Sequence, residues 1–210
     1  MSRRRRSGTR TPRPVMRIFT EGAKTEINYV RGYVSAYLAN RGYTCHDIVL
    51  EQPTDYSPTG LFAAAQQDGL EGDVVWIVFD CDRHPDKGGV FRCAAEQGVK
   101  IAYSSISFET WILLHFCYST RAFASCAELV RVLERYFPKG YDKAKSNLFE
   151  ETAGPRAERL PTAIANAKRL VREVTAVNPG RPLQDLNPYT NVHELLEAID
   201  SFVGRHHSRL

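Results

Sequence analysis

The sequence predicts an α/β fold in which helices flank a mostly parallel, four-stranded sheet, followed by a helical C-terminal extension. Short apolar runs alternate with stretches of helical periodicity over the first half of the chain. This alternation favours parallel strands joined by right-handed helical crossovers. Residues 74–79 form an uninterrupted apolar run rich in valine, which is typical of a strand buried on both faces.

Four strands and three helices account for the first half of the chain. The strands are predicted at residues 15–20, 46–51, 74–79 and 99–104, where apolar runs lie between turn residues. The helices are predicted at residues 24–40, 61–67 and 90–97, each followed within two residues by a glycine, which commonly ends a helix.

The second half is predicted to be helical. Ser107 is a candidate N-cap, and Ser125 with Glu128 has the spacing of a capping box. Pro161 suits the first turn of a longer helix, and a last helix follows Asn191. The chain is therefore divided into a disordered basic arm (1–14), an α/β core (15–118), a helical extension packed on the core (119–204) and a flexible tail (205–210).

The basic arm concentrates the positive charge of a chain whose formal net charge is +4. It contains Arg3, Arg4, Arg5 and Arg6, followed by Ser, Gly, Thr and Pro between further arginines, a composition typical of disorder. An arm that contacts phosphates of nucleic acid would bind in a salt-sensitive, sequence-independent way. A solubilising tail explains the same composition equally well.

Cysteine usage and hydropathy predict a cytoplasmic protein. The five cysteines are scattered and form no Cys-x-x-Cys pair, which argues for reduced thiols and against a disulfide scaffold or zinc finger. No apolar run is long enough to span a membrane. No apolar segment follows the basic N-terminus, so we expect no secretory signal.

Carboxylates follow three of the predicted strands. Asp80 and Asp82 come directly after the third strand, two residues apart and therefore on the same side of extended backbone. Such a pair is unfavourable unless a proton or a cation intervenes, and Mg²⁺ favours carboxylates together with phosphate oxygens. Glu21 follows the first strand, and Glu109 begins the helix after the fourth. Because parallel strands end at one edge of the sheet, these acids are predicted to meet around a cation.

Two further residues are candidate phosphate contacts. Lys24 lies near a predicted helix N-terminus, where backbone donors favour anions, and His84 lies in the polar loop after the acid pair. A P-loop is excluded because Arg17 occupies the place of its upstream glycine. A solvated surface residue is the simpler explanation of both Lys24 and His84, and helix-dipole stabilisation is a sufficient explanation of Glu109. His115, in an apolar stretch, is predicted to be a core histidine.

These motifs resemble those of the RloB-like (AbiLii-like) family of Toprim-domain proteins. The family often has an acid at the place of Ala23, and usually Asn-Pro where Ser105-Ile106 stand here. The matching stretches are Phe19-Thr20-Glu21-Gly22-Ala23-Lys24-Thr25-Glu26-x-x-Tyr29, Val78-Phe79-Asp80-Cys81-Asp82, Ser107-Phe108-Glu109-x-Trp111-Ile112-Leu113-Leu114-His115-Phe116 and Asn187-Pro188-Tyr189-Thr190-Asn191-Val192-His193.

The resemblance implies a Toprim/Rossmann-like fold and a nuclease that hydrolyses DNA or RNA phosphodiesters with Mg²⁺, or with Mn²⁺ as a substitute. It implies that Asp80, Asp82, Glu21 and Glu109 hold the metal, with Glu21 as an alternative general acid or base. It also implies a role in anti-phage defence or abortive infection beside restriction–modification genes, with an ATPase partner subunit; a homo-oligomer is compatible with this. Two rivals remain: a defence subunit that binds nucleic acid or a partner without cutting, and a metal-dependent phosphatase of small substrates.

Overall fold

A five-stranded sheet forms the centre of the computed structural model, which describes residues 13–43, 45–81 and 87–207. Its order is β2-β1-β3-β4-β5. The first four strands are parallel, and β5 pairs antiparallel with β4. The strands are β1 (Met16–Thr20), β2 (Ile48–Glu51), β3 (Val74–Asp80), β4 (Lys100–Ser105) and β5 (Tyr189–Thr190).

The mostly parallel sheet is confirmed, but the prediction of four strands is wrong by one. β5 comprises only Tyr189 and Thr190, beside β4. Two residues after a proline carry no alternating apolar pattern, so the sequence gives no strand signal there. Asn191 continues the edge with its side chain: its Oδ1 accepts from the Tyr103 backbone N–H at 2.7 Å, and its Nδ2 donates to the Ile101 carbonyl at 2.9 Å.

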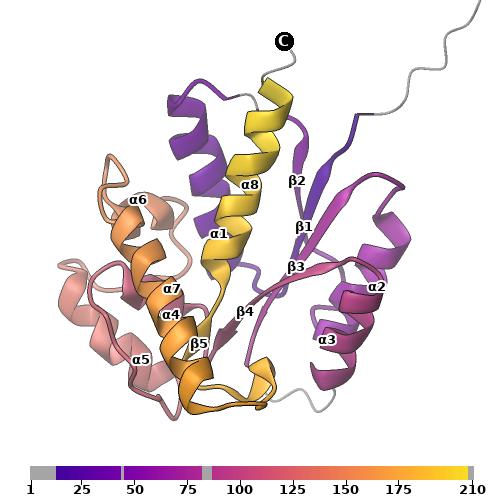
Figure 1. The fold of residues 1–210 in the computed structure, drawn as a ribbon. Helices are drawn as coiled ribbons and strands as arrows, with labels where there is room; N and C mark the ends of the chain where they lie inside the picture. The colour runs from indigo at the N-terminus through magenta and orange to yellow at the C-terminus, as the bar shows by residue number, and fades with distance from the viewer. Residues whose placement is uncertain (1–12, 44, 82–86, 208–210) are drawn as a thin grey trace, which may run out of the picture.

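Helices cover both faces of the sheet (Figure 1). α2 (Pro58–Asp68) and α3 (Lys87–Glu96) lie together on one face. α1 (Thr25–Gly32), which continues as the π-helix η1 (Tyr33–Leu38), lies on the other face with α8 (Val192–His207). None of the helices in the described part of the chain has the length and apolar character needed to cross a bilayer.

A second group of helices packs beside α1 and α8 (Figure 1). α4 (Glu109–Leu114) contacts α5 (Cys126–Leu133) and α7 (Leu160–Val177), and α6 (Leu148–Ala153) packs on α1. The 3₁₀ turn η2 (Glu134–Tyr136) belongs to this group, whereas η3 (Leu183–Asp185) lies near the start of α3, where Gln184 approaches Gly88. Gly32 permits the close approach of α6, because a Cβ there would lie 2.5 Å from the Cβ of Phe149.

The predicted caps are only partly confirmed. Ser125 Oγ accepts from the Glu128 N–H at 3.3 Å, while the Glu128 carboxylate accepts from the N–H of Ala124 instead of that of Ser125. Ser107 does not cap its helix: its carbonyl accepts from the Thr110 N–H, and its buried hydroxyl has no hydrogen-bond partner among the described residues.

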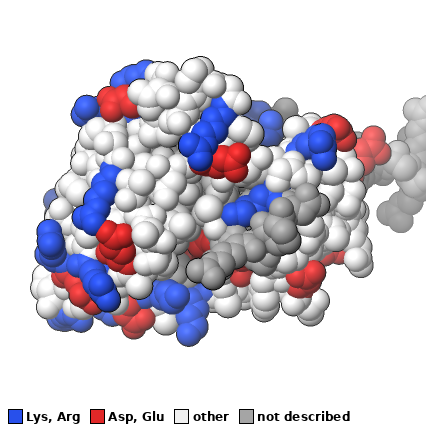
Figure 2. Space-filling view, turned by 90° about the horizontal axis from the view of Figure 1, so that it is seen from below, with Lys and Arg blue, Asp and Glu red and all other residues white. Residues whose placement is uncertain are grey.

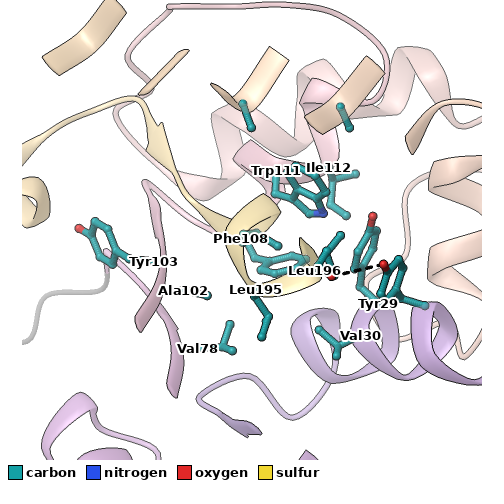
Figure 3. Close-up of a cluster of buried hydrophobic side chains, with 14 of the residues drawn as sticks. Tyr29, Val30, Val78, Ala102, Tyr103, Phe108, Trp111, Ile112, Leu195 and Leu196 are labelled. Atoms are coloured by element: carbon teal, nitrogen blue, oxygen red, sulfur yellow. Dashed lines mark hydrogen bonds between the residues drawn. The ribbon is translucent and has the colours of Figure 1, made fainter. Parts of the chain in front are cut away.

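An aromatic cluster fills the space between the sheet, α1, α4 and α8 (Figure 3). Tyr29 is fully buried, and its ring meets those of Phe108 and Trp111 edge-on. Its hydroxyl is 2.9 Å from His115 Nε2, and His115 Nδ1 is 3.1 Å from the Trp111 carbonyl oxygen. Burial lowers the pKa of His115 to about 3, so this histidine is neutral, and its prediction as a core residue is confirmed.

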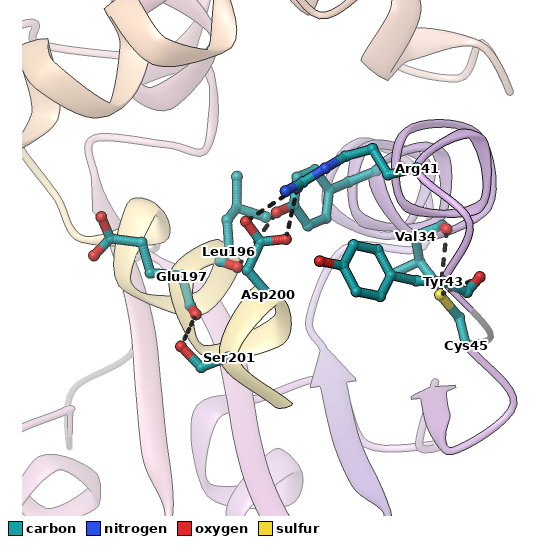
Figure 4. Close-up of polar contacts among 9 residues, drawn as sticks. Val34, Arg41, Tyr43, Cys45, Leu196, Glu197, Asp200 and Ser201 are labelled. Carbon is teal, nitrogen blue, oxygen red and sulfur yellow. Dashed lines mark hydrogen bonds and ion pairs between the residues drawn. The ribbon is translucent and has the colours of Figure 1, made fainter. Parts of the chain in front are cut away.

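Polar contacts connect α8 with the residues at and just after the end of η1 (Figure 4). The Arg41 guanidinium lies 3.3 Å from Asp200 Oδ1. The same group lies over the rings of Tyr37 and Tyr43, at 5.1 and 5.4 Å from their centroids. The contact between Arg41 and Asp200 therefore joins α8, the last helix, to the segment between the first helix and β2. Both parts of the chain cover the same face of the sheet (Figure 1).

Candidate active site

A cavity of about 660 Å³ lies at the carboxyl edge of the sheet, where β1 and β3 end and α4 begins. The parallel strands run downward in Figure 1, so the view from below in Figure 2 looks onto this edge. The cavity is lined by the three predicted metal ligands that the structure describes, Glu21, Asp80 and Glu109. Lys24, a predicted phosphate contact, lines it as well. Asp82, His84 and Arg3–Arg6 lie outside the described residues.

Glu21 is fixed against the tip of β3. Its backbone N–H donates to the Val78 carbonyl at 2.9 Å, which extends the pairing of β1 with β3 by one residue. Its carboxylate Oε2 accepts from the Asp80 backbone N–H at 3.0 Å. The two acids therefore sit at neighbouring strand ends, as the predicted topology requires.

Glu26 is a fourth carboxylate at this cavity, and the sequence did not predict it as a site residue. It lies in the first turn of α1 and is only 6% exposed. Burial, and after it the negative charges of Glu109 and Glu21, raises the pKa of Glu26 to about 7. A backbone hydrogen bond and the positive charge of Lys143 lower the pKa and offset part of this rise. The group therefore changes protonation near neutral pH.

Gly22 has a specific steric role beside Glu26. A Cβ at residue 22 would lie 1.6 Å from Glu26 Oε2 and 2.3 Å from its Cδ. The carboxyl group thus occupies the space that any other side chain at residue 22 would need. The glycine after Glu21 accordingly allows the Glu26 carboxyl group to pack against the β1–α1 turn in this position, and a larger residue would require that group to move.

Glu109 also lines the cavity and is 3% exposed. Tyr141 donates its hydroxyl proton to Oε1 at 3.1 Å, and the Cys126 thiol donates to Oε2 at 3.6 Å. Burial, then the Glu109 charge, raises the pKa of both Tyr141 and Cys126. Both groups therefore keep their protons and remain donors to Glu109.

The donor atoms suit a hard divalent cation, although a complete ligand set is not formed by the described residues. Carboxylate oxygens are the ligands that Mg²⁺ prefers. The pKa of Glu26 is raised chiefly by burial and secondly by the charges of Glu109 and Glu21, which a cation would offset. Among the residues that the structure describes, no three His, Cys, Asp or Glu side chains are arranged to hold a metal ion. Asp82, a predicted ligand, lies outside them.

Sequence reasoning missed Glu26, Tyr141, Cys126 and Lys143, which also line or support the cavity. Glu26 stands in the quoted motif, yet a first-turn acid is explained by the helix dipole alone. Tyr141 and Lys143 belong to a segment between α5 and α6 without regular periodicity. Their position at the cavity depends on the tertiary fold, for which this segment carries no local signal.

Comparison with known proteins identifies one relationship. A family model described as RloB-like protein matches residues 16–199, which is most of the chain and includes all the described carboxylates at the cavity. Neither the curated proteins nor the solved structures gave a match.

Proposed function

The chain belongs to the RloB-like family, and we propose that it is a Toprim-type, metal-dependent nuclease that hydrolyses DNA or RNA phosphodiesters in anti-phage defence. One observation supports this proposal above all others. Carboxylates from three separate strand–helix junctions, Glu21, Asp80 and Glu109, line a single cavity at the carboxyl edge of the sheet. Open α/β sheets place their ligand sites at this edge.

Glu21 and Asp80, together with Asp82, are the residues that we assign to Mg²⁺, for which Mn²⁺ is the expected substitute. Glu109 is assigned to the same site, where Tyr141 and Cys126 donate to its two oxygens and orient them. When bound, the divalent cation would polarise the phosphoryl group and offset the charge on the leaving oxygen. The cavity already concentrates the negative charge that such an ion requires.

Glu26 is the residue that we assign to proton transfer. General acid–base catalysis is most effective when the pKa of the group lies near the working pH, and the pKa of Glu26 is raised to about 7. Lys24 and Lys143 line the cavity with Glu26 and supply positive charge for a phosphate. The glycine at residue 22 leaves the space that the carboxyl group of Glu26 occupies.

A cleavage assay tests the proposal. Purified full-length protein is incubated with labelled single- and double-stranded DNA and RNA, in Mg²⁺, in Mn²⁺ and in EDTA. We expect metal-dependent cutting that falls about 100-fold or more in Asp80→Asn and in Glu26→Gln. Asp68→Asn, at the end of α2, is the matched control and should retain activity. Cutting that persists in EDTA or in Asp80→Asn would refute the proposal.

Direct metal binding separates this function from its rivals. Mn²⁺ titration followed by electron paramagnetic resonance should show a site that Asp80→Asn removes and Asp68→Asn retains. Turnover of a generic phosphatase substrate without nucleic-acid cutting would favour a small-substrate phosphatase. Nucleic-acid binding without a metal site would favour a non-cleaving defence subunit. The cleavage assay is repeated with co-expressed ATPase partner protein, because the family resemblance implies such a subunit.

A further inference from the structure

A connected row of aromatic side chains leads from the carboxylate cavity to the protein surface. Tyr141, which donates to Glu109, packs edge-on against Phe137 with 5.1 Å between ring centroids. Phe137 packs in the same way on Phe116 at 5.3 Å. Phe116 in turn stacks on Tyr136 at 4.9 Å, with only 16° between the ring planes.

Tyr136 ends this row at the surface. Its side chain is 37% exposed, which makes it one of the few large apolar side chains that the fold leaves open to solvent. Phe116 covers one side of the ring, and Tyr136 borders a hollow of about 220 Å³ with Lys139 and Lys145. An aromatic ring that is stacked on one side, partly exposed and beside a hollow is a platform on which a nucleic-acid base can stack.

The row is held rigidly. The Arg159 guanidinium lies 5.1 Å from the centroid of the Phe116 ring, and the same side chain donates to the Thr152 carbonyl at 2.7 Å. Tyr141 is fixed by its bond to Glu109, and the following residues are tied to α1 by Asn28, whose Nδ2 donates to the Ala144 carbonyl at 3.2 Å. A base that stacked there would lose little affinity to ordering of the protein.

Positive charge accompanies the aromatic row. Lys139 is exposed in a tight turn, which the Gly140 N–H closes on the Phe137 carbonyl at 2.9 Å. Lys143 is also exposed and lines the carboxylate cavity. Lys145 borders the hollow but is paired with Glu151. Figure 2 shows basic side chains on the left of this face, the side on which α5 and α6 lie in Figure 1.

We propose that this surface, formed by Tyr136, Lys139 and Lys143 and supported from beneath by the rings of Phe116, Phe137 and Tyr141, binds single-stranded nucleic acid and leads it to the carboxylate cavity. The inference rests on the proposed nuclease function and specifies the strandedness of its substrate. One unpaired base stacks on Tyr136, and Lys139 and Lys143 contact the phosphates between that base and the cavity. A duplex cannot use the surface in this way, because its bases are already stacked on one another.

Fluorescence anisotropy with full-length protein in EDTA tests the inference without cleavage. The probes are a short mixed-sequence labelled strand, as RNA and as DNA, and the duplex of the same sequence. Tyr136→Ala should weaken binding of the single strand about 5- to 100-fold, while Tyr136→Phe should bind as wild type because the ring is kept. Tyr56→Ala, at another exposed tyrosine (45%) in the loop before α2, is the matched control and should bind normally.

Salt titrations test the cationic part of the surface. Lys139→Ala should reduce the slope of log affinity against log salt concentration by about 0.7, which is the contribution of one phosphate contact in a single strand. Lys100→Ala, at the opposite edge of the sheet where β4 begins, should leave the slope unchanged. Unchanged slopes in both variants would remove Lys139 from the binding surface.

Three results would overturn the inference. The first is that the wild-type protein does not bind the single strand, and the second is that Tyr136→Ala and Tyr56→Ala bind it with equal affinity. The third is that Tyr136→Ala loses the same amount of affinity for the single strand and for the duplex. Each is distinguishable from failure of the nuclease proposal. Cutting that depends on Asp80, combined with normal binding by Tyr136→Ala, would reject the surface and keep the nuclease. Binding that depends on Tyr136, without cutting in any metal, would reject the nuclease and keep the surface.

Discussion

Replacement of Glu26 by glutamine should change how the stability of the protein depends on pH. The pKa of Glu26 is 4.5 in an unfolded chain and is raised to about 7 in the fold, chiefly by burial. Between these values the folded state binds more protons than the unfolded state, so stability must fall as pH rises. The favourable contribution is complete below the unfolded pKa and is lost as pH passes through the folded pKa.

The magnitude follows from the same two values. The full difference between the two pKa values corresponds to about 3 kcal/mol in the free energy of unfolding. About 2.5 kcal/mol of this stabilisation is lost between about pH 5 and pH 8. Glutamine is nearly isosteric with a protonated glutamic acid and cannot ionise. Glu26→Gln should therefore match wild type only well below the unfolded pKa of 4.5, be more stable by about 1 kcal/mol near pH 5, and be more stable by about 3 kcal/mol near pH 8.

Urea denaturation across this pH range, in EDTA, measures the difference between the two proteins. The difference in the free energy of unfolding between Glu26→Gln and wild type is compared at each pH, because the protonation of His115 changes the stability of both proteins, in the direction opposite to that of Glu26. The pKa of His115 is lowered to about 3 by burial, so its contribution is lost as pH falls from about 6.5 towards 3. Glu71→Gln, at an exposed glutamate, is the control and should give a flat difference. A flat difference for Glu26→Gln would refute the argument that the fold buries this carboxyl group beside other acids.

Three further predictions concern other parts of the chain. Tyr29→Phe should lower the free energy of unfolding by about 1–3 kcal/mol, because His115 Nε2 loses its partner in a fully buried site; urea denaturation measures this. Asp73→Asn should cost about 2 kcal/mol in the same assay, because the carboxylate accepts from Arg17 and from the backbone N–H of Val15; Arg17 retains Glu51 as a second partner. Deletion of residues 1–13 should weaken nucleic-acid binding and flatten its salt dependence in anisotropy titrations; no change in either would leave the arm as a solubilising tail.

Those parts of the fold that depend on local pattern were predictable from the sequence. Short, largely apolar runs bounded by turns located β1, β3 and β4 to within one residue. The clearest is the run at residues 74–79, because a strand buried on both faces needs continuous apolar sequence. The order of strands and helices then placed Glu21, Asp80 and Glu109 at one edge. The strand β5 escaped prediction because its two residues are in a strand only through their pairing with β4, a tertiary contact that leaves no local pattern.

The β1–α1 turn shows why the composition of a site is harder to predict than its location. Gly22 reads in the sequence as a turn residue, and Glu26 as an acid that complements a helix dipole. Gly22 and Glu26 are each explained by their local position in the sequence, so nothing in the sequence indicates that the two residues contact each other. In the fold they form one unit, because the carboxyl group of Glu26 fills the space beside Gly22 that a Cβ would otherwise occupy. The same placement buries Glu26 near Glu21 and Glu109 and raises its pKa towards neutrality. The Glu-Gly pair is therefore part of a larger arrangement: Glu21 faces Asp80, and Gly22 makes room for a second carboxyl group that can exchange a proton.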